Sequence, residues 1–142
     1  MTSARPGALS DADLDDLQDA LVRSRPAGLR DHRRPVGHVV RAEGGELLAG
    51  IAGHVEFGWL CIGTFWVHEA HRSRGLGARL LATLERDAVG WDCHDAYVDT
   101  FSFQARPFYE RHGYRVFGEL REFPPGHRKY FLHKTLGAGG GS

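Results

Sequence analysis

Arg72 and Arg74 stand beside Gly75 and Gly77 in the segment HRSRGLGARL, which covers residues 71–80. The apolar run TFWV precedes this segment, and leucines at helical spacing follow it. A strand that enters a helix through a glycine-rich loop offers unpaired backbone N–H groups and a partial positive charge to an anion. The glycines would let a phosphate approach the backbone, and the arginines would add charge-assisted hydrogen bonds. The segment predicts a phosphate site, with an ordinary charged surface loop as the alternative.

Two common nucleotide-binding motifs do not fit this segment. A Walker loop ends in Gly-Lys-Ser/Thr, which the chain lacks, and the dinucleotide fingerprint needs a glycine where Leu80 stands. His68 and His71 in the segment HEAH are three residues apart in a predicted loop, whereas the zinc protease motif places its histidines four apart on a helix. We therefore expect no metal site.

The elements that must position this loop follow from periodicity and turn residues. Ser10 and Asp13 form a capping-box pattern at the start of a first helix, and Gly63 marks a bulge or a close backbone approach in an aromatic-rich strand. The alternation of strands and helices predicts an α/β protein with a sheet of mixed direction. The predicted order is a helix (9–23), three antiparallel strands (37–67), a helix (76–90), a strand (95–101), a helix (102–113) and two strands (114–123 and 128–136).

Composition narrows the class of protein. The 142 residues indicate one domain over residues 1–136, followed by a flexible glycine-rich tail over residues 137–142. The 18 basic and 18 acidic residues balance, which speaks against nucleic acid as a partner. No apolar run reaches the length of about 20 residues that a membrane span needs, and no signal peptide is visible, so we expect a cytoplasmic protein. Cys61 and Cys93 are expected to be buried free thiols.

Two motifs together carry a resemblance to a known family. The residues Arg72 to Gly77 resemble the R/Q-x-x-G-x-G/A signature of the GNAT superfamily of N-acetyltransferases. The segment ARPFYERHGY resembles the family's A-x-x-x-Y-x-x-x-G-Y/F pattern, with Ala105, Tyr109, Gly113 and Tyr114 in register. The order of elements from about Val36 to Leu136 also matches that fold. The resemblance implies a mixed, mostly antiparallel central sheet flanked by helices.

The resemblance implies acetyl-CoA as the cosubstrate. In this family the loop binds the pyrophosphate through backbone amides, the preceding strand pairs with the pantetheine arm, and the acetyl group lies in the gap between two splayed parallel strands. Ser102 falls where many members have an asparagine, so its contact with the cofactor is less certain than the others. The residues implied in cofactor binding are Phe65, Trp66, Val67, Arg72, Ser73, Arg74, Gly75, Leu76, Gly77, Ala78, Arg79, Ser102 and Ala105.

The resemblance also assigns catalytic roles. Tyr109 matches the family's general acid, which would protonate the departing thiolate; packing against the sheet while orienting the sulfur is the alternative. Asp99, Glu56 and His94 are candidates for the general base. We favour Asp99, which could equally anchor the turn from Phe101 to Gln104. The position of Glu56 near a hairpin turn is more typical of a solvated residue at the rim of the site than of a general base.

The family usually opens with a strand before the first helix, but MTSARPGA contains Pro6 and Gly7 and is a poor strand. The first strand is therefore expected to be absent or very short. The leading function is transfer of an acetyl group from acetyl-CoA to a primary amine, of a small molecule in preference to a peptide or protein. A non-catalytic acyl-CoA sensor or partner module is the alternative. Dimers are common in such folds, so a homodimer is one expectation.

Overall fold

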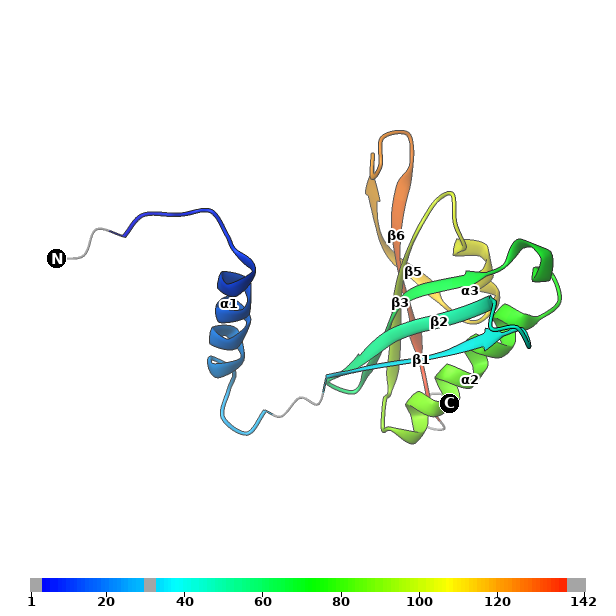
Figure 1. The fold of residues 1–142 in the computed structure, drawn as a ribbon, viewed down its shortest axis with the longest axis horizontal. Coiled ribbons are helices and arrows are strands. Elements are labelled where there is room, and N and C mark those ends of the chain that lie inside the picture. Colours follow the sequence, from blue (N-terminus) through cyan, green and yellow to red (C-terminus); the bar gives the residue numbers. More distant parts are fainter. Residues whose placement is uncertain (1–3, 30–32, 138–142) are drawn as a thin grey trace. The chain divides into compact units, whose positions relative to one another are not determined.

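The computed structural model describes residues 4–29 and 33–137 and forms two compact units, residues 1–30 and residues 31–142 (Figure 1). The order of elements is the one that the sequence predicts. The elements are α1 (Asp11–Arg23), β1 (Arg34–Arg41), β2 (Leu47–Glu56), β3 (Trp59–Val67), the 3₁₀ turn η1 (Glu69–His71), α2 (Leu76–Gly90), β4 (Asp95–Phe101), α3 (Arg106–Arg111), β5 (Arg115–Arg121) and β6 (Arg128–Thr135).

The first unit contains one helix, α1, which begins with the predicted capping box. The Ser10 hydroxyl accepts a hydrogen bond from the Asp13 backbone N–H at 3.1 Å, and the Asp13 carboxylate accepts one from the Ser10 N–H at 3.0 Å. These two bonds satisfy backbone donors that a helix start leaves unpaired. No residue of α1 is buried. Residues 4–10 contain no strand, and the remainder of the doubtful first strand, residues 1–3, lies outside the described residues.

The second unit is built on a six-stranded sheet in the order β1-β2-β3-β4-β6-β5 (Figure 1). Only β3 and β4 are parallel, and the other neighbouring strands are antiparallel. The prediction of a mixed, mostly antiparallel sheet with helices is confirmed. Residues 138–142, which make up most of the glycine-rich tail, lie outside the described part. Among the described residues, no helix is long and apolar enough to span a membrane.

The core of the second unit lies between the sheet and helices α2 and α3. Alternate residues of β4, including Ala96 and Val98, are buried, as expected for a strand with one face covered. The leucines of α2 that recur at helical spacing belong to the same core cluster; α2 buries Leu80, Leu81, Leu84 and Ala88. Cys93 is buried and Cys61 half-buried, and both are free thiols. The core therefore fixes α2, and with it the glycine-rich loop, against the middle of the sheet.

A hydrogen-bonded bridge joins α2 to the segment that follows α3. The buried Tyr114 hydroxyl donates to the Glu85 carboxylate at 2.7 Å, and the Lys134 ammonium donates to the other oxygen of Glu85 at 2.9 Å. Burial, with help from the Glu85 charge, raises the pKa of Tyr114 far above its usual value. Tyr114 therefore stays a hydrogen-bond donor. The bridge holds α2, β6 and the end of α3 in one arrangement.

A bulge bends β3 in its middle, where the sequence predicts one. The register between β2 and β3 shifts between Ala52 and Gly53, and Gly63 has no partner on β2. A Cβ on Gly53 would lie 2.1 Å from the Cys61 carbonyl oxygen, so only glycine fits there. Pairing between β3 and β4 covers only the first four residues of each strand and ends at Ile62 and Val98. The parallel strands separate beyond the bulge.

Candidate active site

A cavity of about 880 Å³ opens where β3 and β4 separate. The second half of β3, the loop before α2, the end of β4 and helix α3 form its walls. Most of the residues that the sequence nominated line it: Phe65, Trp66, Val67, Arg72, Ser73, Gly75, Leu76, Gly77, Ala78, Asp99, Ala105 and Tyr109. Arg74, Arg79 and Ser102 are not among the lining residues. The cavity is large enough for a nucleotide-sized ligand.

The start of α2 faces this cavity with its backbone donors uncapped. Gly75, the N-cap, adopts a left-handed conformation at φ 76°, and no side chain caps the helix. Ser73, at φ 64°, also adopts the left-handed conformation. The Arg72 side chain folds back, and its Nε donates to the Val67 carbonyl oxygen at 3.0 Å, which ties the loop to the end of β3. Uncapped N–H groups and the helix dipole make this end of the cavity attractive to an anion.

The Cα of Gly77 faces the sheet. A Cβ there would contact the Phe65 ring at 3.5 Å and the Val67 side chain at 3.6 Å, which are ordinary contact distances. Glycine at this position therefore widens the space between α2 and β3. From the sequence, a side chain at position 77 is expected to occupy the place of a phosphate. In the structure, a Cβ at this position would point toward β3 instead.

Tyr109 from α3 lies at the inner end of the cavity and is only 4% exposed. Its ring packs edge-on against Phe65, Phe108 and Tyr114 at centroid distances of 6.2, 5.5 and 5.6 Å. No hydrogen bond between the described residues uses its hydroxyl. Burial, and to a smaller degree the charge of Asp99, raises the pKa of Tyr109 well above its usual value. The hydroxyl thus keeps its proton and can donate a hydrogen bond to a ligand in the cavity.

Of the three candidate bases, only Asp99 reaches the cavity. Its carboxylate accepts a hydrogen bond from the Tyr97 hydroxyl at 3.4 Å and lies 3.8 Å from the Lys129 ammonium. Glu56 pairs with Arg33 near the β2–β3 turn, and His94 pairs with Asp95 at the start of β4. Glu56 ends β2 and His94 precedes β4, and neither residue lines the cavity, so the geometry favours Asp99 among the three.

The profile of the Acetyltransferase (GNAT) family matches residues 3–114 of the chain. The chain belongs to this family. A blasticidin-S acetyltransferase of Streptomyces morookaense is 41% identical over 95 residues, which cover 66% of this chain and 70% of that protein. An acetyltransferase of Agrobacterium fabrum is 31% identical over 121 residues, 84% of this chain and 88% of that protein. A crystal structure of an acetyltransferase from Bacillus cereus superimposes with a TM-score of 0.85 at 29% identity, covering 94% of this chain and 98% of that one.

These similarities confirm the family and the fold, and they make the chain an acetyl-CoA-dependent acetyltransferase. The family, whose cosubstrate is acetyl-CoA, was predictable from two motifs about thirty residues apart. The structure brings both motifs to one cavity: the first supplies the start of α2 and the second supplies Tyr109.

Ser102 does not line the cavity of this GNAT enzyme and hydrogen-bonds instead to the backbone of Arg128. Its backbone N–H donates to the Arg128 carbonyl oxygen at 2.8 Å, and its hydroxyl accepts from the Arg128 N–H at 3.0 Å. The neighbouring turn is anchored by Gln104, whose Oε1 accepts from the Phe101 N–H at 3.1 Å, and not by Asp99. Phe103 and Gln104 line the cavity in place of Ser102.

Sequence reasoning missed the lining residues of α3 other than Tyr109. Phe108, Arg111 and His112 all face the cavity of the GNAT enzyme. The His112 Nδ1 donates to the Phe108 carbonyl oxygen at 2.8 Å, so its Nε2 is the nitrogen left for a ligand. Helical spacing was the available signal for two of them, because Phe108 follows Ala105 by three positions and His112 follows Tyr109 by three, and residues three or four positions apart share a helix face.

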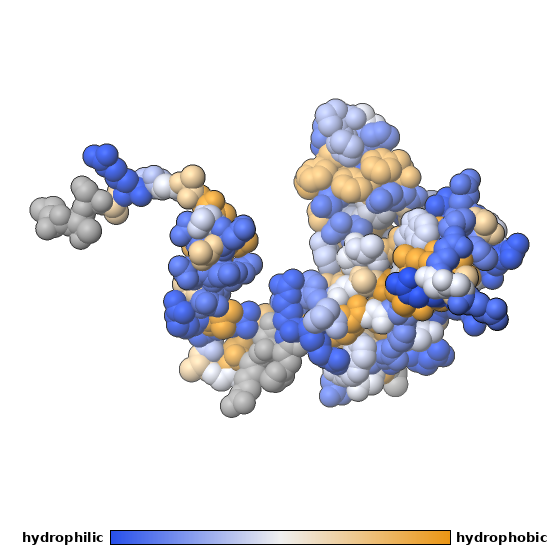
Figure 2. Space-filling model, in the orientation of Figure 1, coloured by the Kyte–Doolittle hydropathy of each residue, from blue (hydrophilic) through white to orange (hydrophobic). Residues whose placement is uncertain are grey.

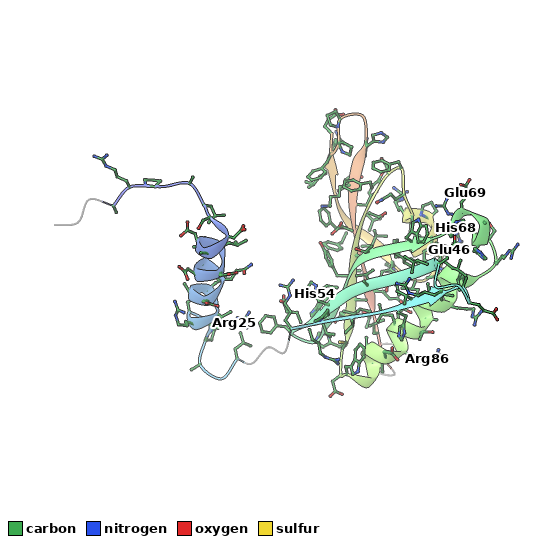
Figure 3. All side chains as sticks on the ribbon, viewed as in Figure 1. Arg25, Glu46, His54, His68, Glu69 and Arg86 are labelled. Carbon is green, nitrogen blue, oxygen red and sulfur yellow. The ribbon has the colours of Figure 1, made fainter. Side chains whose placement is uncertain are left out.

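The histidines of the HEAH segment do not form a metal site with neighbouring side chains. The His68 Nδ1 accepts a hydrogen bond from the Ala70 N–H at 3.0 Å and so caps η1, while its Nε2 lies 3.7 Å from the Glu46 carboxylate. Figure 3 shows His68, Glu46 and Glu69 at one end of the sheet and His54 at the other. Within residues 4–29 and 33–137, no three metal-ligating side chains come together.

Proposed function

We propose that the enzyme transfers the acetyl group of acetyl-CoA to a primary amine of a small molecule, by direct attack within a ternary complex. The observation that carries the proposal is the juxtaposition, around one cavity, of an uncapped helix start and a buried tyrosine with an unpaired hydroxyl. The first feature suits a pyrophosphate, and the second suits a leaving group. The relative named for blasticidin S supports a small-molecule acceptor.

Acetyl-CoA would lie with its diphosphate at the N–H groups that begin α2, from Arg72 to Ala78. The unpaired edge of β3 from Phe65 to Val67 would hydrogen-bond the amide arm, since its backbone has no partner on β4 there. Ala105 would contact the arm from α3. Arg74 and Arg79 lie outside the lining and would act on the diphosphate only through their long-range charge.

The chemistry requires a proton donor at the sulfur. The amine nitrogen forms a bond to the thioester carbon, the carbon–sulfur bond breaks, and the sulfur leaves with the electron pair and takes a proton. Tyr109 would donate that proton. A thiol has a reference pKa near ~8.5, below that of a phenol, but the burial that raises the pKa of Tyr109 would also raise that of a thiol in the same cavity. Burial therefore acts on both groups in the same direction.

Asp99 would remove the proton that the attacking ammonium must lose, either directly or through a water molecule. An alkylammonium has a reference pKa near ~10, so it enters mostly charged. A carboxylate at the cavity wall attracts this cation and aligns it. The Lys129 ammonium, at 3.8 Å, would be exchanged for the substrate ammonium as a partner of Asp99.

Two measurements in sequence test this proposal. Calorimetry with acetyl-CoA measures binding, and a thiol-release assay over a panel of amines measures turnover. Micromolar binding together with amine-dependent thiol release is the expected result. Binding without thiol release for every amine would indicate a non-catalytic acyl-CoA sensor, and release only with peptide amines would move the acceptor to proteins.

Gly77→Asp with Gly77→Ala as its matched control tests the placement of acetyl-CoA. The alanine methyl group fits at ordinary contact distance from Phe65 and Val67. The aspartate adds a negative charge between α2 and β3, close to the proposed diphosphate site. We expect the aspartate variant to bind acetyl-CoA at least tenfold more weakly and the alanine variant to stay within about threefold of the parent. Equal affinity of the two variants would argue against this placement.

A further inference from the structure

Three phenylalanine rings stack in a row beside the cavity, and we refer to Phe101, Phe103 and Phe123 as the aromatic wall. The rings of Phe101 and Phe103 are nearly parallel, with an interplanar angle of 2° and a centroid distance of 5.3 Å. Phe123 stacks on Phe101 at 5.8 Å and 28°. Phe103 also lines the cavity, so the wall continues its surface outward. Figure 2 shows hydrophobic atoms gathered near the tip of the β5–β6 hairpin.

Hydrogen bonds between two chain segments hold the aromatic wall in place. Ser102, between two of the rings, makes two hydrogen bonds with the backbone of Arg128, at 2.8 and 3.0 Å. The Phe123 N–H donates to the His127 carbonyl oxygen, and the His127 ring packs edge-on against Phe103 at 4.9 Å. The loop after β4 is thereby joined to the β5–β6 turn. The rings are arranged before any ligand arrives, which reduces the entropy cost of binding.

The aromatic wall leaves a large apolar surface in contact with water. Phe103 is 56% and Phe123 44% exposed. Each exposed aromatic ring forgoes the stabilisation that its burial would give. Rings that are held rigidly by polar contacts and still left exposed suit a surface that a ligand covers.

Charged groups place the aromatic wall next to the proposed amine site. The Lys129 ammonium lies 4.8 Å from the centroid of Phe123 and 5.6 Å from that of Phe101. The same ammonium is 3.8 Å from the carboxylate of Asp99, which faces the cavity. A small molecule whose amine reached Asp99 would therefore have its adjoining part against the wall.

We propose that the aromatic wall binds a flat aromatic or heteroaromatic part of the acceptor amine. The inference rests on the proposed acetyl transfer and names the class of its acceptor. The exposed rings of Phe103 and Phe123 can stack on, or pack edge-on against, another flat ring, and they fit a puckered saturated ring less well. Continuity with the cavity through Phe103 favours the acceptor itself over a separate macromolecule.

Two amines with the same skeleton test the proposal: 2-phenylethylamine, which is flat, and 2-cyclohexylethylamine, which is puckered. For the parent enzyme we expect kcat/KM for the flat amine to be about three- to tenfold higher, the range expected for one aromatic contact. Phe123→Leu and Phe103→Leu should each bring this ratio close to one. Phe123→Leu should leave the affinity for acetyl-CoA unchanged. The matched control is Phe117→Leu, because Phe117 is 64% exposed on β5 and contacts Tyr97 and Phe131 instead of the wall.

Several outcomes would overturn the proposal. A ratio near one in the parent enzyme, with thiol release from both amines, would reject the aromatic acceptor while leaving acetyl transfer intact. Weaker acetyl-CoA binding in Phe123→Leu would assign the wall to the cosubstrate, and a lower molecular mass in light scattering would assign it to a second copy of the chain. If neither amine is acetylated, ligand-observed NMR with the CoA-bound protein decides: no preference for the flat amine in binding, or no binding at all, rejects the wall as its site.

Discussion

Tyr109 shows how position changes the chemistry of an ordinary side chain. The phenol is nine-tenths or more hidden from solvent, its ring is held by three aromatic neighbours, and its hydroxyl has no partner among the described residues. In water such a group would hydrogen-bond to solvent. At the inner end of the cavity a ligand is the partner to which it can donate a hydrogen bond.

Replacing Tyr109 with phenylalanine tests that role with little change in shape. We expect Tyr109→Phe to lower kcat by about tenfold or more, the usual contribution of acid catalysis, and to leave the affinity for acetyl-CoA within about twofold. Because the pKa of Tyr109 is raised, its ionisation should not limit the rate on the alkaline side of the pH profile below about pH 10. A thiol-release assay measures kcat, and calorimetry measures the affinity for acetyl-CoA. A variant with the parent's kcat would leave Tyr109 a packing role only.

Asp95 carries a second prediction at this scale, far from the cavity. Burial acts to raise the pKa of Asp95, but hydrogen bonds from His133, at 2.6 Å, and from His94 outweigh it, so the pKa lies below the usual value. A lowered carboxyl pKa contributes stability that is present above the unfolded-state value near ~3.9 and is lost as the pH falls below it.

Asp95→Asn should therefore destabilise the fold at pH 6 and matter progressively less below pH 4. Urea unfolding of the parent and the variant at pH 6, 4 and 3 measures the difference in the free energy of unfolding. A difference that stays constant over this range would show that the contribution of Asp95 comes from packing instead of its charge.

At the scale of elements, periodicity and turn residues predicted the α-helices and strands in their order, but not the 3₁₀ turn η1. Apolar residues at spacings of two and of three to four report directly which face is buried, and glycines mark the turns. The separation of β3 from β4 was not predictable from the residues themselves and was known only from the family resemblance. It depends on where a parallel pairing stops, which is decided by long-range contacts and not by local sequence.

The same difference applies to the site. Most residues of the two motifs that line the cavity were nameable from the sequence, because each motif occupies a single loop or helix. Phe103, Gln104 and Arg111 were not, because their exposure to the cavity depends on how α3 and the turn after β4 pack against other elements. Ser102 illustrates the converse. Its place in the sequence suggested a contact with the cofactor, whereas its hydroxyl accepts a hydrogen bond from the Arg128 N–H, 26 residues away.

The bulge in β3 yields a prediction for the element that shapes the cavity. In Gly53→Ala the added Cβ would lie 2.1 Å from the Cys61 carbonyl oxygen, so the strands must move apart. We expect a loss of about 1–3 kcal/mol in the free energy of unfolding. Gly63→Ala is the matched control, because its Cβ would lie 3.8 Å from the Ala52 carbonyl oxygen, an ordinary contact. Denaturant unfolding compares the two, and equal stability of the variants would contradict the close approach at Gly53.

For the whole molecule, ligand binding and stability should be linked. The cavity separates β3 from β4 in the middle of the sheet, and a ligand there would contact α2, α3 and both strands. A molecule that binds only the folded chain stabilises it in proportion to the logarithm of its concentration, by about 2.7 kcal/mol at one hundred times Kd. Thermal unfolding with CoA at such a concentration should show an increase of several degrees in Tm, and Gly77→Asp should show a much smaller one. An unchanged Tm in the parent protein would mean that the cavity does not bind CoA.

The two cysteines have a practical consequence for every assay that follows CoA by its sulfur. Burial, and for Cys61 the nearby charge of Glu56, raises the pKa of both Cys61 and Cys93 above the ordinary value. Chromogenic disulfide reagents react with the thiolate form, so both cysteines should react slowly with such a reagent at neutral pH. The enzyme's own cysteines should therefore add little to the background absorbance, and the absorbance that develops should measure the released CoA thiol.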